Sequence, residues 1–185
     1  MGYPQVNCVA VDNEHLWLED DPAMAVGQAA AVLSAGGTIV FPTDTVYGIL
    51  AGLRHEQAYR RIFELKRRPA HKPLAQLVVE DDAWVKAVEK ALVAHATALE
   101  LFGRGELTLV LPAELLPKGK VLSAALSIQP GLVGLRVPRH NSLQALIAQL
   151  AEPVWATSAN ASGTPPFRRR RPPPSGQSPI ATRRN

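Results

Sequence analysis

The stretch FELKRRPAHKPLAQLV, Phe63–Val78, joins a predicted helix to a predicted strand and carries three consecutive cations at the junction, Lys66–Arg68. Pro69 follows the cations and cannot continue the helix, and the apolar run that comes next has the composition of a buried strand. Cations in the last turn of a helix also interact favourably with the helix dipole. Helix chemistry alone would therefore explain these cations, and a functional role requires support from the rest of the chain.

Helical and strand-like segments alternate on both sides of this stretch, which indicates an α/β fold with a mostly buried sheet. Asp21 and Pro22 mark the start of a helix that Gly36 ends. The longest predicted helix, residues 81–103, carries His95 near its apolar stripe, where we expect a packed histidine. The other predicted helices cover residues 56–68 and 141–150, and the predicted strands cover residues 38–44, 46–52, 74–79, 107–112, 132–138 and 153–158.

Composition limits the class of protein. The chain has 185 residues, of which 46% are hydrophobic, and this is enough for one domain with a core. No apolar run approaches the roughly 20 residues of a membrane helix, and the N-terminus lacks the pattern of a secretory signal. A single cysteine, Cys8, cannot form an intramolecular disulfide framework or a multi-cysteine zinc site. We therefore expect a cytoplasmic protein with no membrane partner.

The positive charge is concentrated at the C-terminal end. Residues 165–185 hold six arginines and no acid, whereas residues 1–164 hold all 16 acids against 14 lysines and arginines, a formal charge of −2. The folded part therefore lacks the basic character of an RNA-binding module, although that class stays an alternative. The Arg/Pro-rich residues 167–185 cannot bury enough apolar surface to fold alone, so we expect a domain over residues 1–166 and a disordered tail.

Four polar clusters lie at the ends of predicted strands or helices: PTDTVYG (42–48), KRRP (66–69), LRVP (135–138) and TSANASG (157–163). Open α/β sheets bind ligands at strand ends, and cations, hydroxyls and an amide gathered there suit a polyanion with a polar group attached. Each cluster alone also has a structural explanation, as a turn, a helix end, a strand charge or a loop. The common phosphate-loop, dinucleotide and zinc-protease motifs are absent from the sequence, and its histidines lack metal-ligand spacing, so we predict no metal site.

Taken together, these clusters resemble the motifs of the YrdC/TsaC family, the threonylcarbamoyl-AMP synthases. PTDTVYG is similar to the N-terminal signature of that family. Lys66, Arg68 and Pro69 match its K-x-R-P motif, and Ser158 and Asn160 match its S-x-N motif. Several motifs in the same order and at similar intervals are a far more specific signal than one short pattern.

The resemblance extends from Ala29 to Pro166 and includes an LRVP strand similar to the one that supplies an arginine in the family, here Arg136. Beyond Pro166 the sequence departs from the family, so we expect the domain to be C-terminally incomplete relative to it. Residues 167–185 are then either a C-terminus replaced by a shift of reading frame or a basic arm that binds tRNA phosphates. A second departure is RGELT, in place of a PGPLT-like loop, because Glu106 adds a negative charge that would weaken anion binding if this loop lines the site.

The resemblance implies a YrdC-like fold, in which a twisted, open, mixed sheet with helices packed on it surrounds a concave, positively lined cavity. It implies a nucleotidyltransferase, an L-threonylcarbamoyladenylate synthase, that makes threonylcarbamoyl-AMP and pyrophosphate from L-threonine, bicarbonate or CO2, and ATP. Downstream transfer proteins would move the threonylcarbamoyl group onto certain tRNAs, and tRNA itself is a candidate partner. No permanently bound cofactor is implied, and Mg2+ would arrive with the ATP phosphates.

The resemblance also implies roles for individual residues. Lys66 and Arg68 would be catalytic, because this adenylation needs no protein nucleophile but needs cations that hold two anions together and neutralise the leaving pyrophosphate. Arg67 would point away from the cavity. Ser158 and Asn160 are alternate residues, so both would face the ligand in an extended segment. The residues expected to contact threonine or the nucleotide are Thr43, Tyr47, Lys66, Arg68, Thr108, Arg136, Ser158 and Asn160.

Other members of the same superfamily are the main alternatives to a synthase. An inactive or YciO-like paralogue would share the fold, although YciO-like proteins typically lack an intact S-x-N motif. The carbamoylating HypF proteins carry a similar domain within a much longer chain that has zinc-finger-like cysteines, which a chain with one cysteine does not resemble.

Overall fold

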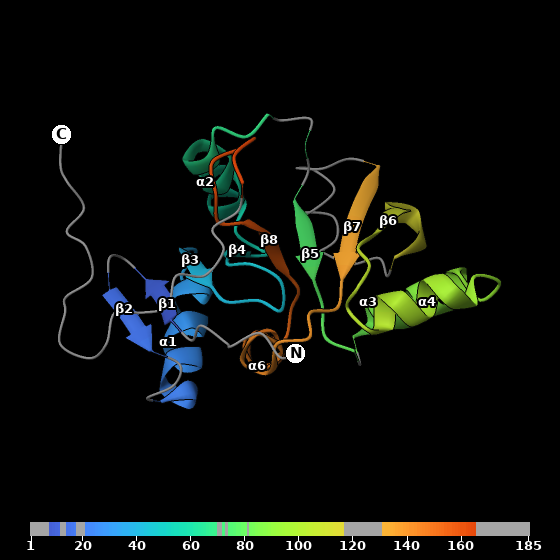
Figure 1. Ribbon diagram of the computed structural model, residues 1–185, viewed down its shortest axis with the longest axis horizontal. Coiled ribbons are helices and arrows are strands. Elements are labelled where there is room, and N and C mark those ends of the chain that lie inside the picture. The colour runs from blue at the N-terminus through green and yellow to red at the C-terminus, as the bar shows by residue number, and fades with distance from the viewer. Residues whose placement is uncertain are drawn as a thin grey trace.

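The computed structural model describes residues 8–11, 14–17, 21–69, 72, 74–80, 82–116 and 131–165. These residues form one open, mixed sheet of eight strands with helices packed against both faces (Figure 1), which confirms the predicted α/β class. The strands are β1 (Cys8–Val11), β2 (Glu14–Trp17), β3 (Thr38–Phe41), β4 (Gly48–Gly52), β5 (Ala75–Leu77), β6 (Leu109–Pro112), β7 (Leu132–Arg136) and β8 (Val154–Ser158). The helices are α1 (Pro22–Ser34), α2 (Glu56–Lys66), α3 (Ala83–Ala91), α4 (Ala96–Gly103) and α6 (Asn141–Leu150), with a 3-10 helix at Ala113–Leu115.

The strands are ordered β2-β1-β3-β4-β8-β5-β7-β6 across the sheet. Neighbouring strands are antiparallel except β5 and β7, which run parallel. Strand β8 is the last in the described chain, yet it lies in the interior of the sheet, between β4 and β5. The two halves of the sheet therefore meet only through β8, and the sheet is continuous only when the chain has been built as far as Ser158.

Neighbouring residues of β8 enter separate cores on the two faces of the sheet. Val154 and Ala156 pack with α1 and α6 on one face, whereas Trp155 packs with α2, α3 and α4 on the other. This alternation is the normal period of a strand, and here both faces are covered. An almost continuous apolar strand such as VWA requires helices on both sides, which explains the layered arrangement.

Helix α1 begins and ends where the sequence signals predict. The Asp21 side chain accepts a hydrogen bond from the Met24 amide at 2.9 Å, and Pro22 occupies the first helical position. Gly36 adopts a positive φ of 83° directly after the helix, a conformation that glycine allows without steric cost.

The end of α2 explains the junction in the stretch Phe63–Val78. Arg67 adopts the left-handed conformation, with φ 48° and ψ 43°, immediately after Lys66. The Arg68 amide then donates to the carbonyl of Phe63 at 2.9 Å, a bond that closes the last turn in a Schellman-type end. A left-handed arginine costs about 1–2 kcal/mol. The contacts around Lys66 described below must offset this cost.

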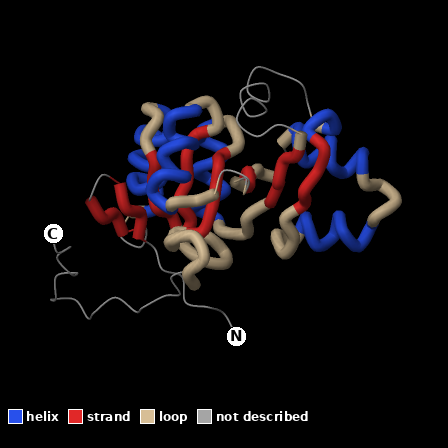
Figure 2. Tube along the Cα trace, turned by 90° about the horizontal axis from the view of Figure 1, so that it is seen from above, coloured by secondary structure: helices blue, strands red, loops and turns tan. Residues whose placement is uncertain are grey.

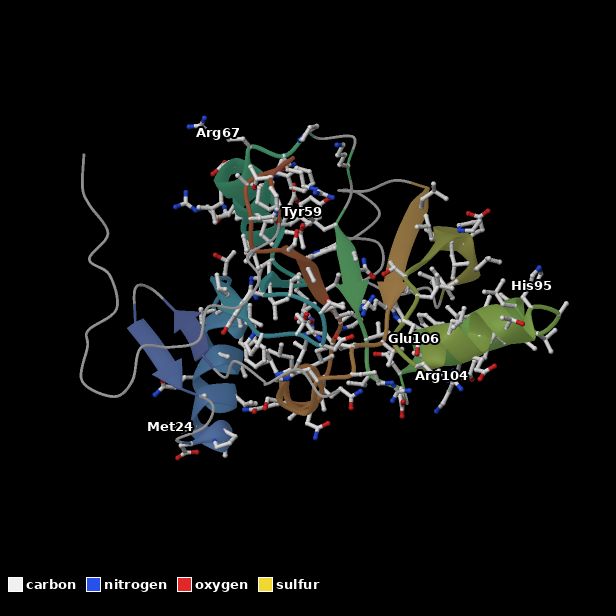
Figure 3. The ribbon with its side chains drawn as sticks, viewed as in Figure 1. Met24, Tyr59, Arg67, His95, Arg104 and Glu106 are labelled. Carbon is white, nitrogen blue, oxygen red and sulfur yellow. The ribbon has the colours of Figure 1, made fainter. Side chains whose placement is uncertain are left out.

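The single helix predicted for residues 81–103 is wrong. The structure has two helices, α3 and α4, which Figures 1 and 2 show as a hairpin joined by a turn at its far end. One continuous helix of this length would extend about 35 Å and carry its second half away from the sheet. The hairpin instead returns Phe102 to the core that holds Trp84 and Val88. His95, which we expected to be packed, is exposed at the start of α4 (Figure 3).

The N-terminal hairpin β1–β2 was not predicted, because its residues gave only a short apolar segment around Cys8. It extends the sheet through the pairing of Ala10 with Val40 of β3. At the other end of the chain, residues 166–185 lie outside the described residues, so the division into a 1–166 domain and a 167–185 tail stays a prediction. None of the helices in the described part of the chain combines the length and the apolar character needed to cross a membrane.

The turn between α4 and β6 depends on Gly105. This residue has a φ of 70°, and a Cβ atom added to it would lie 2.6 Å from the carbonyl oxygen of Val137 and 2.8 Å from Cγ of Arg139. The Arg139 side chain is 40% exposed, whereas the Val137 carbonyl belongs to the backbone that follows β7. Gly105 is therefore required both by its conformation and by the close approach of a second chain segment.

We predict that Gly105→Ala lowers the free energy of unfolding by about 2 kcal/mol or more, because it combines left-handed strain with a backbone clash. Gly103→Ala is the matched control, since Gly103 has no positive φ and its added Cβ would meet no atom within 4 Å. The control should change stability by less than about 1 kcal/mol, in the stabilising direction. Urea denaturation of both variants measures the difference, and equal losses would contradict the assignment.

Candidate functional site

A cavity of about 230 Å³ lies where the ends of β7 and β8 meet the β3–β4 loop. Its lining includes Leu77 and Ala156, which also belong to the core beneath α1 and α6. The cavity therefore opens on that face of the sheet, beyond the edge of the two helices. The polar part of the lining comes from residues 43–45, Arg136 and Thr157–Ser158.

The β3–β4 loop is shaped by the hydroxyl group of Thr43. This hydroxyl donates to the Val46 carbonyl at 2.6 Å and accepts from the amides of Thr45 and Val46 at 3.1 and 3.2 Å. A threonine hydroxyl that bonds to the backbone two and three residues later closes a tight turn. Thr43 therefore lines the cavity, while its hydroxyl holds the loop that presents Asp44.

Arg136 and Asp44 form an ion pair in the wall of the cavity. Arg136 Nη2 lies 2.8 Å from Asp44 Oδ2, and each side chain is 18% exposed. A charge-assisted bond at this level of burial is stronger than one on the open surface. Arg136 and Asp44 are the charged residues among those described as lining this cavity, and their charges offset each other, so the positively lined cavity that we expected stays a prediction.

The Lys66 ammonium group binds the S-x-N segment. Lys66 is 3% exposed, and its Nζ donates to the backbone carbonyls of Ser158 and Asn160, the latter at 2.6 Å, and to Asn160 Oδ1 at 3.3 Å. In return, the Lys66 carbonyl accepts a bond from the Ser162 amide at 3.2 Å. The K-x-R-P and S-x-N motifs are thus in direct contact, and Lys66 supports the cavity wall from behind Ser158.

The electrostatic environment of Lys66 and Arg68 is unusual for surface cations. Burial lowers the pKa of Lys66, and the nearby charge of Arg68 lowers it further. Burial also lowers the pKa of Arg68, whose Nε donates to the Lys72 carbonyl at 2.7 Å. Burial raises the pKa of Tyr59, a neighbour of Arg68, and the Tyr59 ring stands edge-on to Trp155 at 4.7 Å. Perturbed cations at one end of a helix are typical of functional sites.

Arg67 is directed away from the site, as expected. It is exposed, and Figure 3 shows its side chain at the outer end of α2. The left-handed backbone of Arg67 separates Lys66, which turns inward, from Arg68, which is partly exposed. The three consecutive cations of the opening stretch therefore occupy three different environments.

The other predicted site residues are distributed around the cavity. The Tyr47 carbonyl accepts a bond from the Ala159 amide at 2.7 Å, so the first motif is joined to the S-x-N segment by backbone contact. Thr108 precedes β6, and the pairing of Leu109 with Leu135 places it opposite Arg136 when the register is continued by one residue. Glu106 is exposed and is not part of the lining of this cavity.

The structure therefore brings Thr43, Arg136 and Ser158 into one cavity and joins Lys66 to Asn160 behind it. Tyr47, Thr108 and Arg68 are not among the residues that line the cavity. The assignment of all eight residues to substrate binding or catalysis stays a prediction.

Sequence reasoning missed the contributions of Asp44 and His140. A turn was the structural explanation for the cluster PTDTVYG, and the position of Asp44 within this cluster was the only available signal. His140 is 4% exposed, and its Nδ1 accepts a bond from the Leu143 amide at 3.4 Å, so it caps α6. Its signal was equally local, because the histidine immediately precedes a helix start.

Within the described ranges, no group of three or more histidine, cysteine or carboxylate side chains is arranged to hold a metal ion. Mg2+ carried by ATP phosphates stays a prediction.

Comparisons with known proteins agree on one family. The Sua5/YciO/YrdC family model, described as "Telomere recombination", matches residues 31–172. A threonylcarbamoyl-AMP synthase of Bacillus subtilis (strain 168) is 37% identical over 150 residues, which make up 79% of this chain and 40% of the relative. The residues that the family model matches, 31–172, begin two residues after Ala29, the predicted start of the resemblance, and end six residues after Pro166.

Solved structures are similar to about three quarters of the chain. A crystal structure of Pyrococcus abyssi Sua5 complexed with L-threonine is 33% identical, has a TM-score of 0.59, and covers 77% of this chain and 41% of the Sua5 chain. The crystal structure of Escherichia coli YciO is 24% identical, has a TM-score of 0.56, covers 76% of this chain and 66% of the YciO chain, and shows likeness of fold alone. The chain thus spans about two fifths of the length of the Bacillus and Pyrococcus relatives.

We predict that Lys66→Met lowers the free energy of unfolding by about 2 kcal/mol, because it leaves the Ser158 and Asn160 carbonyls without a charged donor. Arg67→Met is the matched control, since it removes an exposed cation from the next residue, and it should change stability by less than about 0.5 kcal/mol. Chemical denaturation measures both. If Lys66→Met were as stable as the control, the contact with the S-x-N segment would not support the wall.

Proposed function

The chain belongs to the Sua5/YciO/YrdC family, and from that premise we propose that it acts as an L-threonylcarbamoyladenylate synthase. L-threonine, bicarbonate and ATP would give threonylcarbamoyl-AMP, pyrophosphate and water. The threonine ammonium group first loses a proton, and the resulting amine attacks CO2, which forms from bicarbonate with loss of water. An oxygen of the resulting carbamate then attacks the α-phosphorus as pyrophosphate leaves. The enzyme would act as a nucleotidyltransferase whose product supplies a tRNA modification.

The observation that carries this proposal is the cavity where Arg136, Asp44 and Ser158 meet. A free amino acid is a zwitterion, and a cavity whose wall holds one guanidinium and one carboxylate matches its two charges. Arg136 would bind the threonine carboxylate by charge-assisted hydrogen bonds. Asp44 lies next to Arg136, so the ammonium group of the same threonine molecule would bind the Asp44 carboxylate. The named ligand of the Pyrococcus relative, L-threonine, supports the same substrate.

The adenylation step requires positioning and charge neutralisation, because no covalent enzyme intermediate is involved. Arg68 is the cation of the K-x-R-P motif that keeps partial exposure, so its guanidinium would hold phosphate oxygens of ATP. Lys66 would contribute chiefly by keeping the Ser158–Asn160 segment in place while ATP binds. This differs from our expectation that Lys66 itself holds the reacting anions, and it follows from the number of carbonyl oxygens that already surround its ammonium group.

The partners that follow from this activity are L-threonine, bicarbonate or CO2, and ATP with Mg2+, with tRNA and downstream threonylcarbamoyl-transfer proteins as later participants. A cytoplasmic location fits these substrates.

One assay tests the activity directly. Purified protein is incubated with ATP, Mg2+ and radiolabelled bicarbonate, with and without L-threonine, and labelled adenylate and pyrophosphate are measured. A synthase produces both only when threonine is present. Absence of product with a folded protein would favour an inactive or YciO-like paralogue, and salt-sensitive tRNA binding without product would favour an RNA-binding module.

We predict that Arg68→Ala reduces adenylate formation about a hundredfold, since the loss of one charge-assisted contact in a transition state costs on the order of 3 kcal/mol. Arg67→Ala, a change at the neighbouring exposed cation, should alter the rate less than threefold. Initial rates of pyrophosphate release at saturating threonine compare the two. Equal losses in both variants would contradict the separate roles of these adjacent cations.

A further inference from the structure

Two complementary polar atoms are buried next to the cavity, and neither has a hydrogen-bond partner among the described residues. They are Oδ1 of Asp44, whose Oδ2 binds Arg136, and Nε2 of His140. A buried polar atom without a partner costs free energy, so each such atom requires an explanation. Here one atom is an acceptor and the other belongs to an imidazole ring.

The tautomer of His140 follows from its role at the start of α6. Its Nδ1 accepts the Leu143 amide hydrogen and therefore carries no proton. In the neutral ring the proton must then be on Nε2, which makes Nε2 a donor. The donor of His140 and the free acceptor of Asp44 are thus matched in chemistry.

The electrostatics of the ring are consistent with contact between these two groups. Burial lowers the pKa of His140, whereas the negative charge of Asp44 and a hydrogen bond to the backbone of His140 act in the opposite direction. The ring also stands edge-on to Phe41, at 6.3 Å between centroids, directly before the loop that carries Asp44. Asp44 is the charged group that acts on the ring, and α6, the helix that His140 caps, carries no charged residue.

We propose that His140 is a positioning residue of the cavity, which donates from Nε2 to Asp44 Oδ1 through one buried water, and so orients the carboxylate that holds Arg136. A continuous series of contacts then runs from the Leu143 amide through His140 and Asp44 to the Arg136 guanidinium. Through it, the first turn of α6 determines where the cation of the cavity stands. The effect on the threonine site rests on the proposed function, whereas the contact between His140 and Asp44 does not.

The variant that separates capping from positioning is His140→Asn. Asparagine is a preferred N-cap residue and can still accept the Leu143 amide, but its side chain is too short to reach Asp44 as imidazole Nε2 does. His95→Asn is the matched control, since His95 is also an N-cap histidine, is exposed, and makes no capping hydrogen bond through its side chain. Both variants should melt within a few degrees of the parent protein.

The first measurement is binding of L-threonine by titration calorimetry. His140→Asn should weaken binding about tenfold and His95→Asn should leave it unchanged. In a double-mutant cycle with Asp44→Asn, the His140 effect should largely disappear, because residues that act through one contact are not additive. Unchanged binding in His140→Asn, or additive losses in the cycle, would overturn the positioning role.

The second measurement needs neither threonine nor activity. Nitrogen-15 NMR of the imidazole rings, with His140 assigned through His140→Asn, should show the Nε2–H tautomer in the parent protein. Asp44→Asn should lower the pKa of His140, because it removes the negative charge that favours the imidazolium. An Nδ1–H tautomer, or an unchanged pKa in Asp44→Asn, would overturn the contact. If the NMR results hold while the parent protein does not bind threonine, the proposed function fails and the contact stands.

Discussion

The arrangement of the site depends on the burial of one ammonium group. A lysine that is 3% exposed needs hydrogen-bond acceptors for its charge, and at Lys66 these are carbonyl oxygens of Ser158 and Asn160, at and just after the end of β8. The contact connects the last residue of α2 to the end of the strand that joins both halves of the sheet. The inward position of Lys66 also accounts for the left-handed conformation of Arg67, which ends α2. If α2 continued by one more turn, Arg68 would be carried away from the Ser158–Asn160 segment.

A second consequence concerns the charge of the cavity. Lys66 is directed behind the wall and Arg136 is paired with Asp44, so the cavity itself is close to neutral in the state described here. A neutral site that holds one positive and one negative group would favour a zwitterionic ligand. It would attract a phosphate group only weakly until Arg68 or a metal ion supplies positive charge.

The elements predicted best are those whose signals are local. Asp21 and Pro22 start α1, and every predicted strand from residue 38 to 158 is present, because apolar runs between turn residues have few other solutions. The break between α3 and α4 was missed because residues 92–95, LVAH, contain no glycine or proline. The break exists because it allows Phe102 to be buried in the same core as Trp84. That core also contains residues of sheet strands that are distant in the sequence, so the local sequence carries no signal of the break.

The same division holds for the site. The order and spacing of PTDTVYG, KRRP, LRVP and TSANASG predicted the family, because each motif can be recognised within its own segment of the sequence. Only the tertiary structure decided that Lys66 braces the Ser158–Asn160 segment, that Asp44 neutralises Arg136, and that His140 stands beside them. Each of these contacts joins residues separated widely along the chain, 92 positions in the case of both Lys66–Ser158 and Arg136–Asp44. Such pairs come together through strand order, and a pattern read within one segment carries no information about which strand lies next to it.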